Sequence, residues 1–484
     1  MTTPHSRVHQ GARWIIAVGC IVLSIVFCLG PGFILVRDLH DPSLRNGDIS
    51  PAAWRLSKTL APRYAAWARE RAAHENDPHS VSGTEWPLFG SVFYLQALEA
   101  LQDDWLRDNS HSAVAPAVYS KDAIAAAAAL IVDPGQAEWV RQYWVGNDYL
   151  HHADLFYRYL LISGMASYTH LTGDDKYLAQ LRDQADSLSA EIDNSPRGFL
   201  DDYPNQCYPP DIISALGAIQ RADSVLHTDH SAIFQRALRA FTKPFVDPHG
   251  LPPFNVMAQT GLPQGPSRGS GDSFDFIATP TLWPGQNTAW YKLYVDQFWQ
   301  RSRGLVGFRE FASDTPSRDE FEDVDSGPVI WGYGVAASAF GVGTTRTQGD
   351  LNRAAPLTAE MLVASWPLPN GTLLTPRLLS DAIDAPYVGE AGILYCLTRP
   401  VPPGTAPATS VMTPFVWLAL AAYFSLGLIL FLPLIVLIRE RRNLASIQAV
   451  QRRGDKTYGT NRTDGIAVKR SIPEAKAPLK IPSS

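Results

Sequence analysis

Two long apolar stretches flank a large polar middle section of the chain. Residues 14–36 and residues 411–438 contain no Asp, Glu, Lys or Arg. About 20 apolar residues in a helix are enough to cross a bilayer. Each stretch is therefore predicted to form a transmembrane helix. The first follows Arg7 and Arg13, as a signal peptide would, but it exceeds the ~7–15 residues of a signal core and no small-residue cleavage site follows. An uncleaved anchor is expected.

The section between these stretches shows the spacing of amphipathic helices. Apolar residues recur at intervals of three and four, and turns rich in Gly, Pro, Asp and Asn separate the segments. Gly173 suits the left-handed end of one helix and Asp174 the cap of the next. The predicted helices cover residues 51–74, 86–106, 121–131, 136–144, 149–171, 174–192, 210–226, 231–244, 287–301, 328–345 and 357–365.

About eleven or twelve helices in hairpins predict a closed helical toroid or an α-solenoid. The all-α (α/α)6 barrel, built from six helical hairpins, fits the length best. Strand-like alternation is scarce. Two segments break the helical pattern, residues 193–210 and residues 247–272, and long loops in a compact domain are usually functional or disordered.

Basic residues lie at the outer ends of both apolar stretches, which predicts that both termini are cytoplasmic. The middle section then lies outside the cytoplasm, on the periplasmic or extracellular side of the cell (inner) membrane. The predicted organisation is a short cytoplasmic N-terminus (1–13), a transmembrane helix (14–36), an extracytoplasmic domain (37–410), a second transmembrane helix (411–438) and a basic, largely disordered cytoplasmic tail (439–484).

The charge of the predicted outer domain restricts its partners. Residues 37–410 hold 28 Lys and Arg against 43 Asp and Glu, a balance of −15. Such an acidic domain is a poor nucleic-acid binder, and anionic headgroups repel it. The expected partners are therefore the bilayer, through the two helices, and a small molecule, with no nucleic acid.

Four cysteines add one constraint. Cys20 and Cys28 lie inside the first apolar stretch, where they behave as small apolar residues. Cys207 and Cys396 remain for the outer domain. They can form one disulfide in an oxidising compartment or stay as free thiols.

The densest group of chemically useful side chains lies in residues 201–211, just before a predicted helix. A thiol at a helix N-terminus has a lowered pKa, which would make Cys207 a nucleophile or an acid/base. The structural alternative is that Asp202 or Asp211 caps the helix and that Cys207 is a buried core residue. The group contains Asp201, Asp202, Tyr203, Cys207, Tyr208 and Asp211.

Two adjacent histidines, His151 and His152, open the predicted helix 149–171. Neighbours on a helix point about 100° apart, so the pair cannot bind one metal as an i, i+4 pair can. No metal site is expected. One histidine facing the mouth of the barrel would serve as a general acid or base, and the alternative is that it packs at a helix start.

Glu85 precedes a helix rich in aromatic residues, among them Trp86, Phe89 and Phe93. Glu85 and an Asp of residues 201–211 would make the carboxylate pair of a glycoside hydrolase, or Glu85 is a first-turn charge favoured by the helix dipole.

Two further segments are ambiguous. Asp325 is either a cap for the next helix or a site residue. Residues 265–272 are rich in Gly but lack the spacing of a phosphate loop, which predicts a mobile rim loop.

Several of these segments together resemble the linalool dehydratase/isomerase family. They are the Thr-Gly-Asp turn between paired helices, residues 85–90 (Glu-Trp-Pro-Leu-Phe-Gly), the His151-His152 pair, residues 203–211 and residues 323–328. The resemblance covers about residues 86–395. It implies an (α/α)6 barrel and cofactor-free acid/base chemistry, namely dehydration of linalool to myrcene and isomerisation between linalool and geraniol.

The resemblance also implies roles for single residues. Cys207 would be the thiol acid/base, His151 or His152 its imidazole partner and Tyr203 a phenol in an apolar pocket. The chain departs from the family because it has no second cysteine near Cys207; Cys396 is distant in the sequence.

The leading hypothesis is a membrane-anchored lyase or isomerase that acts without a cofactor on an apolar, terpene-type alcohol. The alternatives are a carbohydrate hydrolase or lyase that uses paired carboxylates, and a non-catalytic extracytoplasmic binding domain. The predicted catalytic residues are Cys207, His152, His151, Tyr203 and Asp202, and the predicted substrate-binding residues are Glu85, Trp86, Phe89, Phe93, Tyr208, Asp211 and Asp325.

Overall fold

The structure is a computed structural model of the whole chain, and it describes residues 4–71, 80–146, 148–152, 154–315 and 326–459. The described residues are mostly helical, as predicted, with only short strands. The chain divides into two compact units. One comprises Met1–Ser24 with Leu428–Ser484, and the other is Ile25–Gly427.

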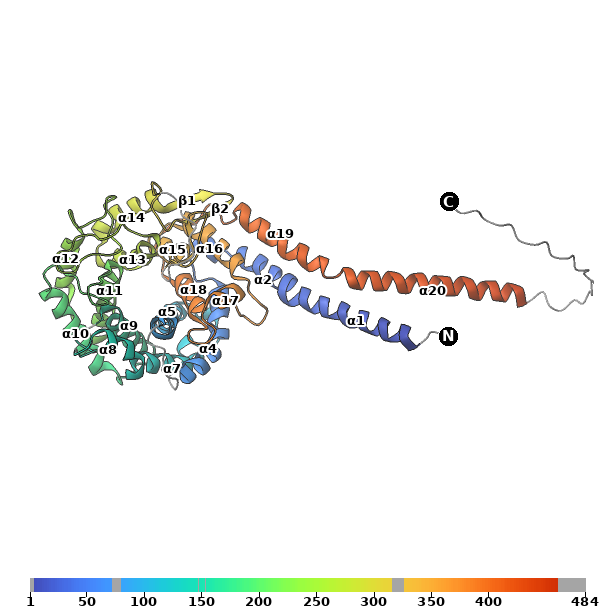
Figure 1. Cartoon of the computed structure of the whole chain (residues 1–484), viewed down its shortest axis with the longest axis horizontal. Coiled ribbons are helices and arrows are strands. Elements are labelled where there is room, and N and C mark those ends of the chain that lie inside the picture. The colour runs from blue at the N-terminus through green and yellow to red at the C-terminus, as the bar shows by residue number, and fades with distance from the viewer. Residues whose placement is uncertain (1–3, 72–79, 147, 153, 316–325, 460–484) are drawn as a thin grey trace, which may run out of the picture. The chain divides into compact units, whose positions relative to one another are not determined.

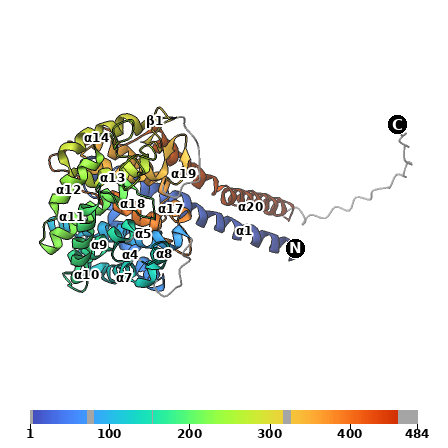
Figure 2. The ribbon, with the colours of Figure 1, turned by 60° about the vertical axis from the view of Figure 1, so that its left-hand side comes forward.

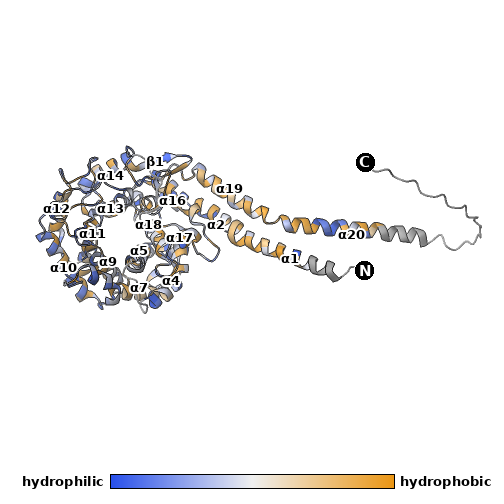
Figure 3. Ribbon diagram, in the orientation of Figure 1, coloured by the Kyte–Doolittle hydropathy of each residue, from blue (hydrophilic) through white to orange (hydrophobic). Residues whose placement is uncertain are grey.

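Two helical segments are long and apolar enough to cross a membrane, Gly11–Leu39 and Pro414–Val450. The first consists of α1 (Pro4–Ser24), a π-helical turn (Ile25–Leu29) and α2 (Gly30–Leu39). The second consists of α19 (Pro414–Ile429) and α20 (Leu432–Gly459). Figure 3 shows apolar colouring along α2, α19 and the start of α20, and a hydrophilic stretch farther along α20. Within the terminal unit, Arg13 of α1 forms an ion pair of 2.9 Å with Glu440 of α20.

The tail from residue 439, predicted to be largely disordered, begins as a continuation of helix α20, which ends at Gly459. No proline or glycine interrupts residues 434–453, which favours a continuous helix there. The disorder of the rest of the tail stays a prediction. Residues 460–484 lie outside the described part of the chain.

Six parallel helices form a closed cycle in the larger unit. Each packs on the next in sequence order, and the last packs on the first. Figure 1 shows them as the inner layer of a ring. Contacts between neighbouring helices show that they are parallel. On α5 and α18, Gly90 contacts Val388 and, farther along both helices, Phe93 contacts Gly392, so the residue numbers increase in the same direction. The six are α5 (Val81–Arg107), α9 (Leu155–Thr172), α11 (Pro209–Leu226), α13 (Gly269–Leu282), α15 (Val335–Thr347) and α18 (Val388–Thr398).

An outer layer of helices packs on this cycle, as Figures 1 and 2 show. Helix α7 packs on α5 and α9, α10 on α9 and α11, α14 on α13, and α16 on α15, while α4 packs on α7 and α18 and α12 packs on α10. The outer helices are α4 (Pro51–Arg71), α7 (Lys121–Val132), α10 (Leu178–Asn194), α12 (Ser231–Leu238), α14 (Pro284–Phe298) and α16 (Leu351–Ser365).

Short elements complete the larger unit. Strand β1 (Trp299–Ser302) pairs antiparallel with β2 (Leu305–Phe308), with Trp299 opposite Phe308, and β3 (Val329–Ile330) pairs with β4 (Tyr333–Gly334). The short helices are α3 (Ser43–Asn46), α6 (Pro116–Tyr119), α8 (Glu138–Tyr143), α17 (Leu374–Leu379) and the 3-10 turns Asn109–His111, Pro134–Ala137 and Arg239–Phe241.

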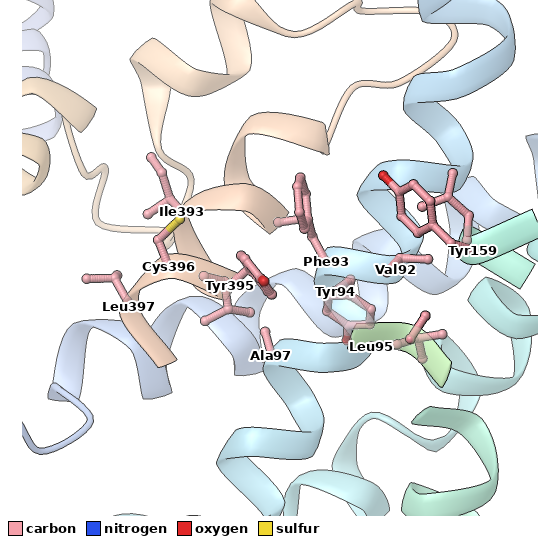
Figure 4. Packing of buried hydrophobic residues seen from close by; sticks show 14 of the residues in the cluster. Val92, Phe93, Tyr94, Leu95, Ala97, Tyr159, Ile393, Tyr395, Cys396 and Leu397 are labelled. Atoms are coloured by element: carbon pink, nitrogen blue, oxygen red, sulfur yellow. The ribbon is translucent and has the colours of Figure 1, made fainter. Parts of the chain in front are cut away.

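Aromatic side chains from several inner helices meet across the centre of the inner cycle. Phe89 of α5 contacts Phe274 of α13 with ring centroids 5.6 Å apart, and Phe93 contacts Phe340 of α15 at 5.7 Å. Since α5 neighbours only α9 and α18 in the cycle, contacts with α13 and α15 must cross the middle. We call Phe89, Phe93, Phe156, Phe274 and Phe340 the aromatic layer. Figure 4 shows Phe93 beside Tyr395 of α18, whose ring centroid lies 4.8 Å away.

Several helix boundaries differ from the prediction, and the largest differences concern the site and its surroundings. Helix α9 begins at Leu155 rather than 149, and α15 begins at Val335 rather than 328, because β3 and β4 occupy residues 329–334. Helix α13 falls partly in the predicted loop 247–272. Its first residue, Gly269, has no room for a side chain: a Cβ there would lie 1.8 Å from the carbonyl oxygen of Arg309. The glycines of this segment thus permit close packing rather than a mobile loop.

Candidate acid/base site at the amino ends of the inner helices

Carboxyl groups gather where the inner helices begin. Glu85 lies in the first turns of α5, Asp154 caps α9, Asp211 lies in the first turn of α11, and Asp275 lies in the second turn of α13. Because the inner helices are parallel, these ends lie at the same end of the cycle. Helix amino ends carry partial positive charge, which attracts acidic groups. Ring closure thereby brings together residues that are far apart in the sequence.

The loop between α10 and α11 adds further groups and is held in place by backbone hydrogen bonds. The Leu155 amide donates to the carbonyl of Asp201 (3.3 Å), and the Val256 amide donates to the carbonyl of Cys207 (3.0 Å). The Tyr208 amide donates to Oδ2 of Asp202 (2.9 Å). Asp202 and Cys207 are fully buried. The loop is therefore a packed element of the site.

Tyr203 joins this loop to helix α5. Its hydroxyl donates to Oε1 of Glu85, and its ring packs against Tyr143 (5.0 Å between centroids) and Trp139 (5.8 Å). Burial, followed by the negative charge of Glu85, raises the pKa of Tyr203 far above its usual value. The phenol stays protonated and acts as a hydrogen-bond donor to a carboxylate.

Burial raises the pKa of three carboxyl groups, Asp154, Asp202 and Asp275, well above the usual aspartate value. Charge repulsion adds to desolvation in each case: Glu85 acts on Asp154, while Asp211 acts on Asp202 and on Asp275. These groups favour the neutral acid form. A neutral carboxyl is a proton donor, and perturbed carboxyl groups of this kind are concentrated at catalytic sites.

All three acids keep polar atoms that have no protein partner. Oδ2 of Asp154, Oδ1 of Asp202 and both carboxyl oxygens of Asp275 are buried and make no hydrogen bond to any described residue. Buried polar atoms without partners cost free energy, so most are satisfied in folded proteins. Atoms left open in this way are available to a bound hydroxyl group or to water.

The prediction of a lowered pKa for Cys207 is wrong. Burial raises its pKa, and Asp202, Asp201 and Asp211 raise it further. Desolvation and three nearby acids outweigh the helix amino end that follows, so the thiol is neutral. Cys396, on α18, is also a free, buried thiol, and the possible disulfide between the two is not formed.

The two predicted histidines lie on the outer side of the site. Because α9 begins at Leu155, both precede the helix that they were expected to open. His151 contacts Asp148 (2.9 Å) and Asp183 (3.0 Å), and the exposed His152 lies 3.4 Å from Glu191. Asp183 and Glu191 belong to α10. The structure therefore directs both imidazoles toward acids outside the carboxyl cluster, and neither is paired with Cys207.

The remaining predicted residues divide between the site and its surroundings. Phe89 and Phe93 belong to the aromatic layer, and half-buried Trp86 follows Glu85 on α5. The Tyr208 hydroxyl donates to Gln206 (3.1 Å), and its ring packs on Phe254. Asp325 lies outside the described residues.

Sequence reasoning missed three residues of the site, Asp154, Tyr159 and Asp275. Burial and the charges of Asp211, Asp202 and Glu85 raise the pKa of Tyr159, which places its phenol beside the carboxyl cluster. Asp154 directly precedes an apolar helical run, which is the signal of a cap. The sequence did not indicate Asp275 as a site residue, because its helix begins in a glycine-rich segment that predicts a loop.

Two cavities in the larger unit lie away from this cluster. One of about 270 Å³ is lined by residues near the end of α2, and one of about 480 Å³ includes Asp103, Asp104 and Arg346 in its lining. Within the described ranges, no group of three or more His, Cys, Asp or Glu side chains is arranged to hold a metal ion.

Comparison of the chain with models of known protein families finds no match. Comparison with curated proteins finds no match either.

Proposed function

We propose that the larger unit is an extracytoplasmic (α/α)6 barrel, held in the cell membrane by two helices with both termini in the cytoplasm. We further propose that it dehydrates or isomerises an apolar, terpene-type alcohol by cofactor-free acid/base chemistry, as its resemblance to the linalool dehydratase/isomerase family implies. The closed cycle of six parallel helices with an outer layer supports the barrel. The basic residues that flank the two apolar helices support the orientation.

One observation carries the proposed chemistry: buried, neutral carboxyl groups lie beside an aromatic layer. Asp275 is 1% exposed, its burial favours the acid form, and both its oxygens are open. Tyr159, whose phenol lies beside the carboxyl cluster, contacts Phe156 of the aromatic layer with ring centroids 5.3 Å apart. An acid that protonates a hydroxyl group and aromatic faces that stabilise the resulting cation are the two requirements of alcohol dehydration.

The proposed reaction begins when Asp275 donates its proton to the hydroxyl oxygen of the substrate. The C–O bond breaks, its electron pair leaves with the oxygen as water, and an allylic cation remains against the aromatic layer. Glu85, oriented by the Tyr203 hydroxyl, takes a proton from the neighbouring carbon, whose C–H electrons form the new double bond. Transfer of that proton back to the Asp275 carboxylate restores the site. In isomerisation, water instead adds to the other end of the allylic cation and loses a proton to the carboxylate.

The test is turnover of linalool and geraniol by membranes that contain the full-length protein, with products identified by gas chromatography. Asp275→Asn keeps the shape of the side chain but removes the acid, and turnover should fall by roughly 100-fold or more. Asp183→Asn, at a surface position on α10, is the control and should retain activity. If the wild type converts no alcohol, or if Asp275→Asn remains fully active, the proposed reaction is wrong.

Two other functions are tested by the same preparation. Glu85 and Asp202 meet in one cluster, as a carbohydrate hydrolase or lyase requires. Release of sugars from a glycan panel by the wild type but not by Glu85→Gln would favour that activity. Aromatic rings meet across the centre of the ring. If neither alcohols nor glycans are turned over, the aromatic layer would instead serve a non-catalytic binding domain.

A further inference from the structure

We propose that the cavity of about 270 Å³ at the end of α2 binds the headgroup phosphate of a glycerophospholipid. The proposal rests on the membrane anchoring stated above and is independent of the acid/base chemistry. The cavity is lined by Arg37, Asp38, Asp41, Pro51, Trp54, Arg55, Lys58 and His111.

The lining carries an excess of positive charge at its rim. Arg37, Arg55 and Lys58 supply three cations, against the carboxylates of Asp38 and Asp41. Asp38 is buried and uses its two oxygens on Arg37 (3.3 Å) and Arg55. The side chain of Arg37 is nevertheless 62% exposed. Lys58 is exposed, and its Nζ has only a long contact of 3.5 Å to a backbone carbonyl. Arg37 and Lys58 therefore keep donors for an anion.

An aromatic ring forms one wall of this cavity. Trp54 is 3% exposed, and its ring stacks on His111, with centroids 5.7 Å apart and an interplanar angle of 17°. The indole nitrogen itself is shielded from solvent. Trp54 therefore shapes the cavity, and the exposed cations Arg37 and Lys58 provide the donors to a phosphate.

The position of the cavity favours a lipid over a free anion. Arg37 lies two residues before the end of the apolar segment Gly11–Leu39. Arginines at the ends of membrane helices extend their guanidinium groups to the headgroup level. Because the cavity begins at this residue, its opening lies at the depth of the lipid phosphates. Inorganic phosphate would provide the same chemistry but none of the acyl chains that anchor a lipid beside the helix.

The mixed lining selects among lipids. The outer domain is strongly acidic, so a net anionic headgroup is repelled over most of its surface. Phosphatidylethanolamine carries a phosphate for Arg37 and Lys58 and an ammonium group for the carboxylate of Asp41. Zwitterionic phosphatidylethanolamine is therefore the expected ligand, and phosphatidylcholine, whose quaternary amine has no N–H donor, should bind more weakly.

Native mass spectrometry of the full-length protein in detergent tests the proposal, with dioctanoyl-phosphatidylethanolamine as the probe. The wild type should retain one molecule of this lipid. The double variant Arg37→Gln/Lys58→Gln should retain roughly tenfold less, since it removes two charge-assisted contacts to the phosphate. Arg45→Gln, an exposed position on α3 that does not line the cavity, is the matched control and should retain the lipid as the wild type does. Arg55 is kept intact because it pairs with buried Asp38.

Three results would overturn the proposal. Equal retention of the lipid by the wild type and the double variant would show that Arg37 and Lys58 do not bind the phosphate. Equal retention of dioctanoylglycerol, which lacks a phosphate, would show that only the acyl chains bind. Displacement of the lipid by millimolar inorganic phosphate would identify a site for the free anion. The two proposals can fail separately, because the lipid assay contains no alcohol substrate. Absence of alcohol turnover would not change the amount of lipid that the protein retains, and absence of lipid binding would not change alcohol turnover.

Discussion

Replacement of Glu360 by Gln should stabilise the protein above pH 7 and have no effect near pH 4. Glu360 lies on α16 and is 6% exposed. The Val306 amide of β2 donates to both of its carboxyl oxygens, at 3.1 and 3.2 Å. Burial is the main cause that raises the pKa of Glu360 from 4.5 to about 7. The folded protein therefore binds a proton at this residue over a pH range in which the unfolded chain has already lost it.

The sign and size of the effect follow from this pKa difference. The stabilisation is fully present below pH 4.5 and is lost as the pH rises through 7, because ionisation is harder in the folded state. A shift from 4.5 to about 7 at roughly 1.4 kcal/mol per pKa unit makes the loss about 3 kcal/mol. For a unit of this size, with an unfolding entropy of roughly 2 cal/mol/K per residue, the thermal midpoint falls by about 4 °C. Gln cannot ionise and avoids this loss.

The assay is thermal unfolding of the full-length protein in detergent at pH 4 and pH 8. Glu360→Gln should raise the midpoint by about 4 °C at pH 8 and leave it unchanged at pH 4. Glu138→Gln, at a side chain that is 55% exposed, should change neither midpoint. An equal shift at both pH values, or a lower midpoint at pH 8, would refute the reasoning, because the effect would then not arise from ionisation of Glu360.

Three further predictions concern other parts of the larger unit. Gly269→Ala should lower the thermal midpoint, since its Cβ would meet a backbone carbonyl, whereas Gly285→Ala in helix α14 has open space and should raise stability by up to about 1 kcal/mol; differential scanning fluorimetry compares them, and equal midpoints would contradict the packing argument. Cys207 is buried with a raised pKa, so maleimide at pH 7 should label it only after denaturation, and rapid labelling of the native protein would contradict the assigned neutral thiol. Arg158→Met should destabilise the fold by roughly 3–5 kcal/mol, because it removes a fully buried guanidinium that pairs with Glu191 (2.8 Å) and donates to Gln184 and Ser187; unfolding in guanidinium chloride measures this, and an unchanged midpoint would count against the pair.

The helices could be predicted from local pattern, but several of their ends could not. The spacing of apolar residues identifies α4, α5, α7 and α11 to within a few residues. The start of α9 was placed too early because His151 and His152 look compatible with a helix, while Asp154, which caps it, decides the true boundary. Helix α13 was missed because its glycines usually break helices, and only the approach of Arg309 explains why glycine is required there.

The candidate site could be predicted only in part. Residues 201–211 stand out because acids, phenols and a thiol occur close together in the sequence, and the structure joins Tyr203 to Glu85 as part of one cluster. The expected reactive thiolate is wrong, because the pKa of Cys207 depends on burial and on Asp202, which local sequence does not reveal. Asp275 could not be predicted as a member, since its proximity to Asp211 arises from packing of α13 against α11.

The sequence by itself determined the mainly helical class, the two apolar helices at the ends and the acidic character of the section between them. These properties depend on residues close together in the chain, whose periodicity and hydrophobicity act locally. Only the tertiary structure decided which carboxyl groups meet, which of them are neutral and which thiol is buried. Those properties depend on desolvation and on charges from distant segments, and both arise when the six inner helices close into a cycle.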